Sequence, residues 1–271
     1  MIIDIHTIIF SFVFGSFIGS FFNVVIWRFP RNESLIHRRS YCPKCKTQIH
    51  WYQNIPLLSW ILQKGRCGFC RKEISIRYPL IECLCAVLYV LCNFAFPNSL
   101  RNNSEEFILL AGWIFVSILL TLSIIDFDHL WLPESICRLG FFSGLITILI
   151  NSLSLKLNDI WPYLFNHAGA ICIGYLGFQA LRAFTRIIYR KDVVGRGDAN
   201  LASMLGVWLG INGLGIAISL AYIFSGIFVL IGFLLNRLNR GEFIAFGPFL
   251  SIGGLLVWLF GNEFWVHLIY M

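Results

Sequence analysis

The chain has 271 residues, of which 58% are hydrophobic and only 13% charged, with a net charge of +7 and a mean hydropathy of +0.74. This composition excludes an ordinary soluble globular domain and indicates a protein that crosses a membrane several times. The positive charge does not require a nucleic acid partner, because a basic face meeting anionic lipid accounts for it at about 1 kcal/mol per Lys or Arg.

The first apolar segment, residues 7–27, has 21 residues without an ionisable side chain, enough to span roughly 30 Å of hydrocarbon. No basic stretch precedes this segment and no small-residue cleavage site follows it, so we expect a retained helix rather than a secretory signal peptide. Further membrane helices are expected over residues 78–96, 107–125, 135–155, 160–181 and 243–261.

The 37 uncharged residues from Ala199 to Leu235 are too many for one membrane helix. Ile211-Asn212-Gly213 is the expected turn between two helices, because Asn-Gly favours a reversal. The sequence thus predicts an all-α integral membrane protein with about eight transmembrane helices. We expect one membrane domain over residues 1–271 that carries a small cytoplasmic insertion at residues 28–77.

The basic residues predict the orientation, because cytoplasmic loops of membrane proteins hold an excess of Lys and Arg. With the N-terminus outside and eight crossings, 19 of the 21 basic residues fall on one side, 11 of them between Arg28 and Arg77. Only Arg101 and Lys156 fall on the other side. This topology places Asp126 and Asp198 at the same cytoplasmic surface of the membrane.

The insertion carries two C-x2-C pairs separated by 21 residues: Cys42 with Cys45, and Cys67 with Cys70. Such pairs are typical of a tetrahedral zinc site in which each pair supplies two thiolates. Disulfides are the alternative, and a reducing cytoplasm disfavours them. Because four sulfurs close the site, the zinc is expected to be structural.

Other cysteines and histidines are not expected to bind the metal. His37 and His50 are interpreted as bystanders, since the four sulfurs leave no position for them. The remaining cysteines lie in apolar spans and are interpreted as small packing residues: Cys83, Cys85, Cys92, Cys137 and Cys172.

Gly195-x-Gly197-Asp198 opens an apolar helix, and its two glycines allow backbone and substrate to approach closely. Taken alone, the motif is more typical of a turn in which Asp198 is an ordinary helix N-cap. Likewise Asp126, Asp128 and Glu134 could simply solvate a short loop. The predicted convergence of Asp126 and Asp198 favours a functional pair, because ionisable groups near hydrocarbon are costly.

The helix ends suggest different roles for the two carboxylates. Asp126 ends one helix, where the macrodipole favours the neutral form, and Asp198 begins another, where it favours the charged form. Our hypothesis is that the two share a proton, with Asp126 as the acid and Asp198 as the base that activates water. The 13 residues from Ala199 to Ile211 cover only about 20 Å, so Asp198 is expected below the lipid surface or beside a thinned bilayer.

Motifs along nearly the whole chain resemble those of the bacterial type IV prepilin peptidases, GxGD-type aspartic proteases of the membrane. Gly19-Ser-Phe-Phe-Asn-Val-Val-Ile-Trp-Arg-Phe-Pro30 is similar to the family's first-helix signature, and Ile76-Arg-Tyr-Pro-Leu-Ile-Glu82 to the segment after its cysteine loop. The two catalytic aspartate motifs match Asp126 with Leu132-Pro133, and Gly195-x-Gly197-Asp198. Phe246-Gly-Pro-Phe249 matches the last helix, and Glu134 replaces the family's usual Asp with the charge kept.

The resemblance implies cleavage of prepilin or pseudopilin leaders after a glycine, on the cytoplasmic side of a bacterial inner membrane. It makes Asp126 and Asp198 the catalytic residues. It also implies N-methylation of the new terminus, usually a phenylalanine, with S-adenosylmethionine as methyl donor. The substrates could be true pilins or the pseudopilins of type II secretion or competence.

Two other classes of function stay open at the level of sequence. A proton-coupled transporter could use Asp126 and Asp198 as a relay, although both are expected at one membrane face with no acidic group opposite. A non-catalytic scaffold of a pilus or secretion machine could bind partners through its zinc loop.

Overall fold

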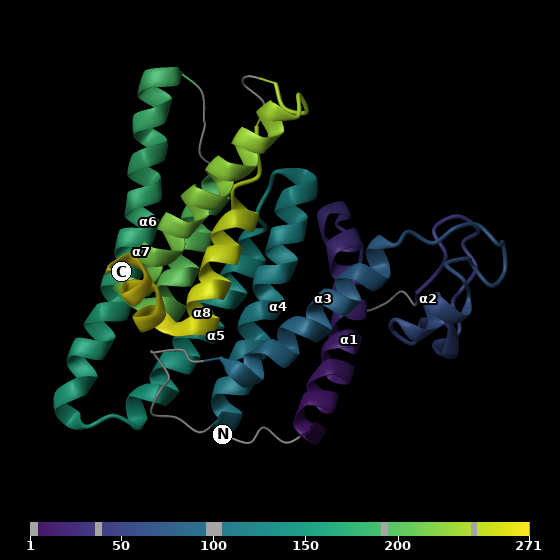
Figure 1. Ribbon diagram of the computed structural model, residues 1–271, viewed down its shortest axis with the longest axis horizontal. Coiled ribbons are helices and arrows are strands. Elements are labelled where there is room, and N and C mark those ends of the chain that lie inside the picture. Colours follow the sequence, from purple (N-terminus) through teal and green to yellow (C-terminus); the bar gives the residue numbers. More distant parts are fainter. Residues whose placement is uncertain (1–4, 36–39, 96–104, 191–194, 240–242, 271) are drawn as a thin grey trace. The chain divides into compact units, whose positions relative to one another are not determined.

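A computed structural model gives the structure of residues 5–35, 40–95, 105–190, 195–239 and 243–270. Contacts divide the chain into two compact units, Met1–Asn93 and Phe94–Met271. In these ranges the regular elements are helices (Figure 1). Two isolated β-bridges, Tyr41–Gln48 and Arg66–Glu73, lie in the loop between the first two long helices. Seven of the helices described are long and apolar enough to cross a membrane. The prediction of an all-α, multi-pass membrane protein is therefore confirmed.

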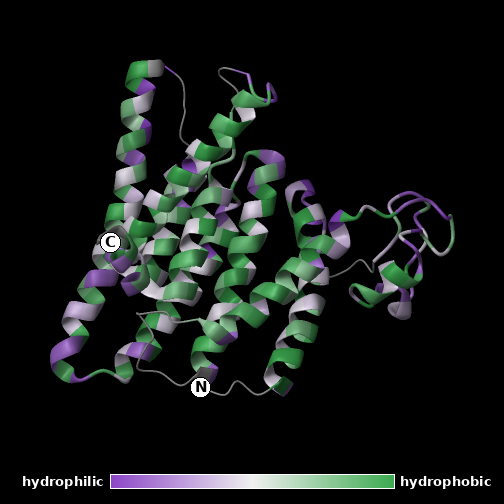
Figure 2. Ribbon diagram, in the orientation of Figure 1, coloured by the Kyte–Doolittle hydropathy of each residue, from purple (hydrophilic) through white to green (hydrophobic). Residues whose placement is uncertain are grey.

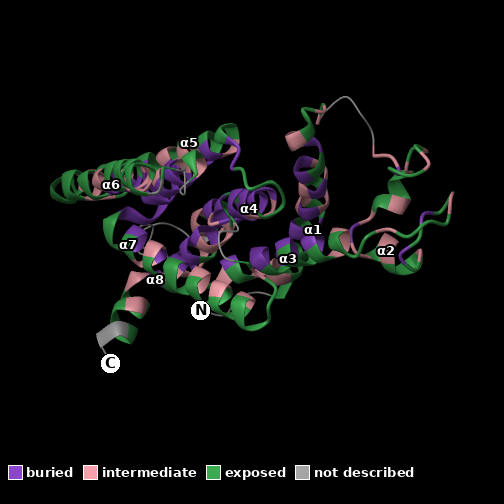
Figure 3. Ribbon diagram, turned by 90° about the horizontal axis from the view of Figure 1, so that it is seen from above, coloured by how far each residue is buried: buried purple, intermediate pink, exposed green. Residues whose placement is uncertain are grey.

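The surface of the long helices is that of a protein dissolved in lipid. Figure 2 shows hydrophobic residues along most of the length of these helices, and Figure 3 shows many outward faces exposed. Phe165 and Leu176, for example, are 69% and 62% exposed. Exposed apolar side chains at this density would be unfavourable in water, and a bilayer solvates them.

The first unit pairs α1 (Ile5–Arg28) with α3 (Arg77–Leu91). The two helices pack closely at two glycines. A Cβ on Gly15 would lie 2.9 Å from the Ala86 Cα, and a Cβ on Gly19 would lie 2.8 Å from the Glu82 Cα. Small residues at such crossings let helix backbones pack without a hydrophobic driving force in lipid. The loop between the two helices contains the 3-10 turns η1 (Phe29–Arg31) and η2 (Trp51–Asn54) and the short α2 (Leu58–Leu62).

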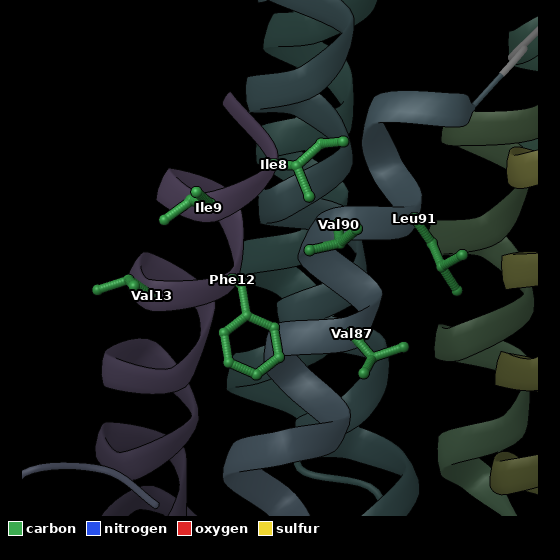
Figure 4. Close-up of a pocket in the computed structure, with 7 residues that line it drawn as sticks. All are labelled: Ile8, Ile9, Phe12, Val13, Val87, Val90 and Leu91. Atoms are coloured by element: carbon green, nitrogen blue, oxygen red, sulfur yellow. The ribbon is translucent and has the colours of Figure 1, made fainter. Parts of the chain in front are cut away.

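An apolar pocket of about 350 Å³ lies on the α1–α3 pair, at the end farthest from this loop. In Figure 4 the ring of Phe12 points from α1 toward α3. Only apolar side chains line the pocket, so we expect acyl chains to fill it: Ile8, Ile9, Phe12, Val13, Val87, Val90 and Leu91.

The second unit contains five long apolar helices: α4 (Glu105–His129), α5 (Glu134–Leu153), α6 (Leu157–Tyr189), α7 (Arg196–Leu234) and α8 (Gly247–Tyr270). Phe115 of α4, Trp208 of α7 and Trp258 of α8 form its aromatic centre, with ring centroids 4.8–5.5 Å apart. The Trp208 Nε1–H donates to the Gly140 carbonyl of α5 at 2.9 Å. This core locks four helices together around the first half of α7.

The helix α7 is two helices rather than one. Its 39 residues would measure about 58 Å if straight. Gly210 interrupts it with φ 70° and ψ −177°, a conformation that favours glycine. Leu205 in its first half and Ala217 in its second half contact the adjacent residues Gly254 and Gly253 of α8, although 12 residues of straight helix would separate Leu205 from Ala217 by about 18 Å. The chain therefore reverses at Gly210, next to the predicted Ile211-Asn212-Gly213 turn, so α7 comprises two of the eight predicted helices. The eight membrane crossings stay a prediction.

Side chains of α6 replace the helix bond that is broken at this reversal. In a continuous α-helix the Ile211 N–H would donate to the Val207 carbonyl. Here the Ile211 N–H donates to Asn166 Oδ1 at 3.2 Å, and the Val207 carbonyl lies 2.7 Å from His167 Nδ1. Because a carbonyl only accepts, Nδ1 carries the proton of this buried histidine. The end of the short helix is thus held by two adjacent residues of α6.

Several helices are longer than the sequence predicted. The helix that Asp126 was predicted to end continues to His129, so Asp126 lies in its last turn. Helix α6, which was predicted over residues 160–181, continues to Tyr189. No Gly or Pro interrupts residues 182–189, and long Arg side chains can extend from a helix to the membrane surface. The last helix bends at Gly261, the predicted end, with φ 74° and then continues.

Candidate active site and metal centre

Asp126 is a buried carboxylate, 5% exposed, in the last turn of α4. Its Oδ2 accepts the Gly247 N–H at 2.9 Å. Gly247 is the first residue of α8, and the first four N–H groups of an α-helix have no partner within the helix. The bond therefore ties the end of α4 to the start of α8. A Cβ at position 247 would lie 2.7 Å from this Oδ2, so only glycine leaves the carboxylate in place.

Asp198 is the second buried carboxylate, 7% exposed, at the third position of α7. Its Oδ2 accepts the Gly195 N–H at 3.1 Å. The N-cap of α7 is Gly195, so Asp198 is not the N-cap that the motif alone suggested; it lies at N3 and accepts the N-cap N–H. Val193 and Val194, which precede the motif, lie outside the described residues. This hydrogen bond uses Oδ2 of Asp198 and leaves Oδ1 available.

Leu132 joins the two carboxylate segments. A Cβ on Gly197, next to Asp198, would lie 2.5 Å from the Leu132 Cβ. A Cβ on Gly247, which binds Asp126, would lie 3.2 Å from the Leu132 Cδ2. One buried side chain therefore packs against both segments, and each segment has a glycine at the contact. The predicted convergence of Asp126 and Asp198 is explained by this close packing.

The two carboxylates are close enough to interact through their charges. Within the described part of the chain, the second oxygen of each has no hydrogen-bond partner. Two buried carboxyl groups of this kind can hold a proton between them and act on a water molecule. The arrangement is chemically suited to general acid and base catalysis.

Two further residues have an electrostatic interaction with the pair. Cys137 of α5 is buried, and the charges of both Asp126 and Asp198 act on it. Tyr222, in the second half of α7, packs at a tilted angle on Phe246 with ring centroids 5.2 Å apart, and the charge of Asp198 acts on it. Sequence reasoning treated Cys137 as packing and did not identify Tyr222, because only the reversal at Gly210 brings it back to Asp198.

The other acidic residues of the α4–α5 connection are not part of this buried group. Asp128 and Glu134 are both exposed. Glu134 is in the first turn of α5, where a negative charge is favourable. Their environment agrees with the simpler of the two interpretations, in which they solvate a short loop and start a helix.

The four cysteines of residues 42–70 form a second, separate constellation. Their sulfurs all lie within 4.8 Å of one another, with Cys42 Sγ and Cys70 Sγ 4.0 Å apart. A tetrahedral zinc site with Zn–S bonds of about 2.3 Å needs sulfurs about 3.8 Å apart, whereas a disulfide needs about 2.05 Å. All four thiols are free. The cluster could hold a metal ion such as zinc.

Each pair lies in a tight turn of the same geometry. The Cys42 N–H donates to the Thr47 carbonyl at 2.9 Å, and the Cys67 N–H donates to the Lys72 carbonyl at 2.9 Å. Lys46 and Arg71 occupy matching positions with φ of 62° and 58°. The repeated turn aims two sulfurs from each pair at one point, as a closed four-sulfur site requires.

Hydrogen bonds and neighbouring sulfurs shift the pKa values of two of the thiols in opposite directions. Hydrogen bonds from the Thr47 side chain and backbone lower the pKa of Cys45 to about 6. The Lys72 backbone lowers the pKa of Cys70, but burial and the neighbouring sulfurs outweigh it and raise that pKa to about 11. Four thiolates repel one another unless a cation lies between them. The donor set therefore fits a metal.

The remaining candidates are placed as follows. His50 stacks on Tyr52 and Phe69 and does not join the cluster; His37 lies outside the described residues. Cys85, Cys92 and Cys137 are buried, as expected of packing residues, whereas Cys83 and Cys172 are exposed on helix surfaces.

Comparison with known proteins gives two family matches. Residues 13–96 match the bacterial peptidase A24 N-terminal domain, and residues 113–231 match the type IV leader peptidase family. No solved structure matches the chain.

Characterised relatives match over most of the chain. A protein of Escherichia coli O78:H11 (strain H10407 / ETEC), described as a type 4 prepilin-like proteins leader peptide-processing enzyme, is 34% identical over 89% of each chain. Prepilin leader peptidase/N-methyltransferases of Neisseria gonorrhoeae and Legionella pneumophila are 32% and 34% identical, over 93% of this chain and 90% of theirs.

Proposed function

Because the chain belongs to the type IV leader peptidase family, we propose that it is a membrane aspartic endopeptidase that removes the leader from type IV prepilins or pseudopilins. The observation that supports the proposal is the buried pair Asp126 and Asp198, whose neighbouring glycines Gly247 and Gly197 both pack on Leu132. The transporter and scaffold hypotheses have no support from the relatives, which are named as processing enzymes.

The proposed reaction uses the pair as one acid and one base. The ionised carboxylate takes a proton from a water molecule, whose oxygen attacks the carbonyl carbon of the scissile peptide. The protonated carboxyl then gives its proton to the leaving nitrogen as the carbon–nitrogen bond breaks. The assignment of Asp198 as base and Asp126 as acid remains a prediction. The hydrogen bonds from Gly247 and Gly195 orient the two carboxylates for these steps.

The depth of the pair suits the substrate. The first half of α7, from Arg196 to Gly210, covers about 22 Å, less than the thickness of the hydrocarbon core. Asp198 would then act close to where a leader peptide bond meets the apolar pilin helix. We place this surface on the cytoplasmic side of a bacterial inner membrane, from the distribution of basic residues, with cleavage after a glycine as the family resemblance implies.

We further propose that the chain methylates the new N-terminus with S-adenosylmethionine, as the names of its relatives suggest. The amine nitrogen would attack the donor methyl group, displace the thioether and release a proton. The four cysteines would hold a structural zinc ion that orders residues 42–70 and leaves no open position for a substrate.

One experiment tests both activities. The purified protein is mixed with a prepilin and S-adenosylmethionine, and the product is weighed by mass spectrometry. We expect the mass of the leader to be lost and the mass of one methyl group to be gained. Leader loss without the methyl increment would remove the second activity, and an unchanged prepilin mass would reject the first.

A further inference from the structure

The loop between α1 and α3 exposes an apolar stripe outside the membrane spans. In α2, Leu58, Ile61 and Leu62 are 57%, 63% and 79% exposed. Their spacing of three and four residues places them on one face of the helix. Side chains on the spans have lipid around them, but a loop in water would gain nothing from presenting three such residues together.

The stripe is held in a fixed orientation. The Leu57 N–H, just before α2, donates to the buried Glu82 carboxylate of α3 at 2.8 Å, and Leu57 has a φ of 62° that a leucine rarely adopts. Within α2, the Trp60 Nε1–H donates to the Ile74 carbonyl at 3.3 Å, and the Trp60 ring packs on Gly65. These bonds turn Trp60 inward and the other apolar residues of α2 outward.

The same hydrogen bond sets the depth of α2. Glu82 is five residues after Arg77, where α3 begins, which is about 7.5 Å along the helix axis. The start of α2 therefore lies beside the second turn of a membrane-spanning helix, not beyond its end. Figure 1 shows α2 to the side of the α1–α3 pair. With Arg77 at the membrane surface, the surroundings at this depth would be the headgroups and the first acyl carbons of the bilayer.

Basic residues follow the stripe directly. A pocket of about 530 Å³ is lined by Gln63, Lys64, Arg66 and Arg71. Three cations and an amide around one opening complement the phosphate of an anionic lipid, and each contributes about 1 kcal/mol near a membrane surface. An apolar face next to a cationic one is the pattern of a helix that lies in the interface.

We propose that α2 is an interfacial lipid-binding element: Leu58, Ile61 and Leu62 enter the boundary between headgroups and acyl chains, and the Lys64–Arg66–Arg71 pocket takes the phosphate of an anionic lipid. The buried Glu82 is the positioning residue that holds α2 at this depth. The four-cysteine loop is attached to the bilayer through its flanking helices α1 and α3, and α2 adds a further attachment. The proposal is independent of the peptidase function.

The test uses the full chain in nanodiscs of phosphatidylcholine with or without phosphatidylglycerol. A photo-crosslinking residue, p-benzoylphenylalanine, replaces Leu62, and the same residue replaces the exposed Gln48 of the first cysteine turn as control. We expect lipid adducts by mass spectrometry at position 62 and few at position 48. Equal labelling at both positions, or adducts to a second copy of the chain or to an added prepilin in place of lipid, would overturn the proposal.

A second measurement tests the cationic pocket. Arg66→Gln is expected to reduce the preference of the position-62 probe for phosphatidylglycerol over phosphatidylcholine about 5-fold, the equivalent of about 1 kcal/mol. Arg66→Lys, which keeps the charge, is expected to retain it. A preference unchanged by Arg66→Gln would remove the pocket from the proposal. Bound metal, measured in each variant, reports whether the loop has kept its fold.

Discussion

The carboxylate pair and the four-cysteine cluster are built in opposite ways. The cysteines lie within 29 residues of chain, and each pair is positioned by hydrogen bonds inside its own turn. Asp126 and Asp198 come from helices far apart in sequence, and Gly247 and Leu132 from two further segments keep them together. The cluster offers four sulfurs, the ligand number of a structural zinc site, whereas each carboxylate keeps one oxygen available. A local site of the first kind can support a fold, and a distributed site of the second kind can carry out chemistry.

The strongest way to sharpen this contrast is to remove one charge from the pair. Asp198→Asn or Asp126→Asn is expected to slow leader cleavage by about 10²-fold to 10⁴-fold or more, because general acid and base catalysis is lost. The rate of prepilin cleavage by the purified variants measures this. Asp128→Asn, which changes an exposed carboxylate in the same segment, is the matched control and is expected to cleave normally. A near wild-type rate for either of the first two variants would end the catalytic assignment.

The next largest effect is expected from the packing that brings the pair together. Gly197→Ala places a Cβ 2.5 Å from the Leu132 Cβ, so the start of α7 must move. A displacement of about 1 Å can cost about 10²-fold in rate. Gly215→Ala, in the same element but with no neighbouring atom within 4 Å, is expected to leave cleavage unchanged. If both variants cleave alike, Leu132 does not set the position of Asp198.

The cysteine cluster should respond in another way. Cys42→Ser is expected to lower the amount of folded protein several-fold, because a structural metal contributes its binding energy to folding. The surviving molecules should cleave at a rate close to that of the wild type. Membrane yield, elemental analysis for zinc and the specific rate distinguish these effects. Cys172→Ser, an exposed helix cysteine, serves as control. A purified sample that lacks zinc but is stable and fully active would reject the structural role.

The smallest effect is expected at the reversal of α7. Asn166→Ala removes the acceptor of the Ile211 N–H and should cost about 0.5–1.5 kcal/mol of stability, the net contribution of one hydrogen bond. Asn212→Ala, an exposed residue of the same turn, should cost less. The thermal unfolding midpoint in detergent or nanodiscs measures both. Equal midpoints would show that α6 does not hold the reversal.

Much of this organisation could be predicted from the sequence, and the reasons differ by site. The spacing of Cys42, Cys45, Cys67 and Cys70 identified their cluster because every constraint on it is local. The reversal near Ile211 could be inferred from the length of the apolar run. Asp126 and Asp198 could be brought together only by counting membrane crossings.

The rest depends on contacts that no local pattern records. Gly247 binds Asp126 and Tyr222 returns to Asp198 only after the helices have packed. Asn166 and His167 read as ordinary polar residues of an apolar helix, and their role depends on the broken helix bond opposite them. The extension of α6 to Tyr189 was missed because arginines were taken as the end of a span, although their side chains tolerate a longer helix.

The most direct test of the central claim is a double-mutant cycle on the pair. Prepilin cleavage is measured for Asp126→Asn, Asp198→Asn and the double variant at one pH and substrate concentration. Residues that act as one catalytic unit are strongly non-additive, so the double variant is expected to be no slower than the slower single variant. Losses that multiply, or a double variant that still cleaves near the wild-type rate, would contradict the account of one shared site.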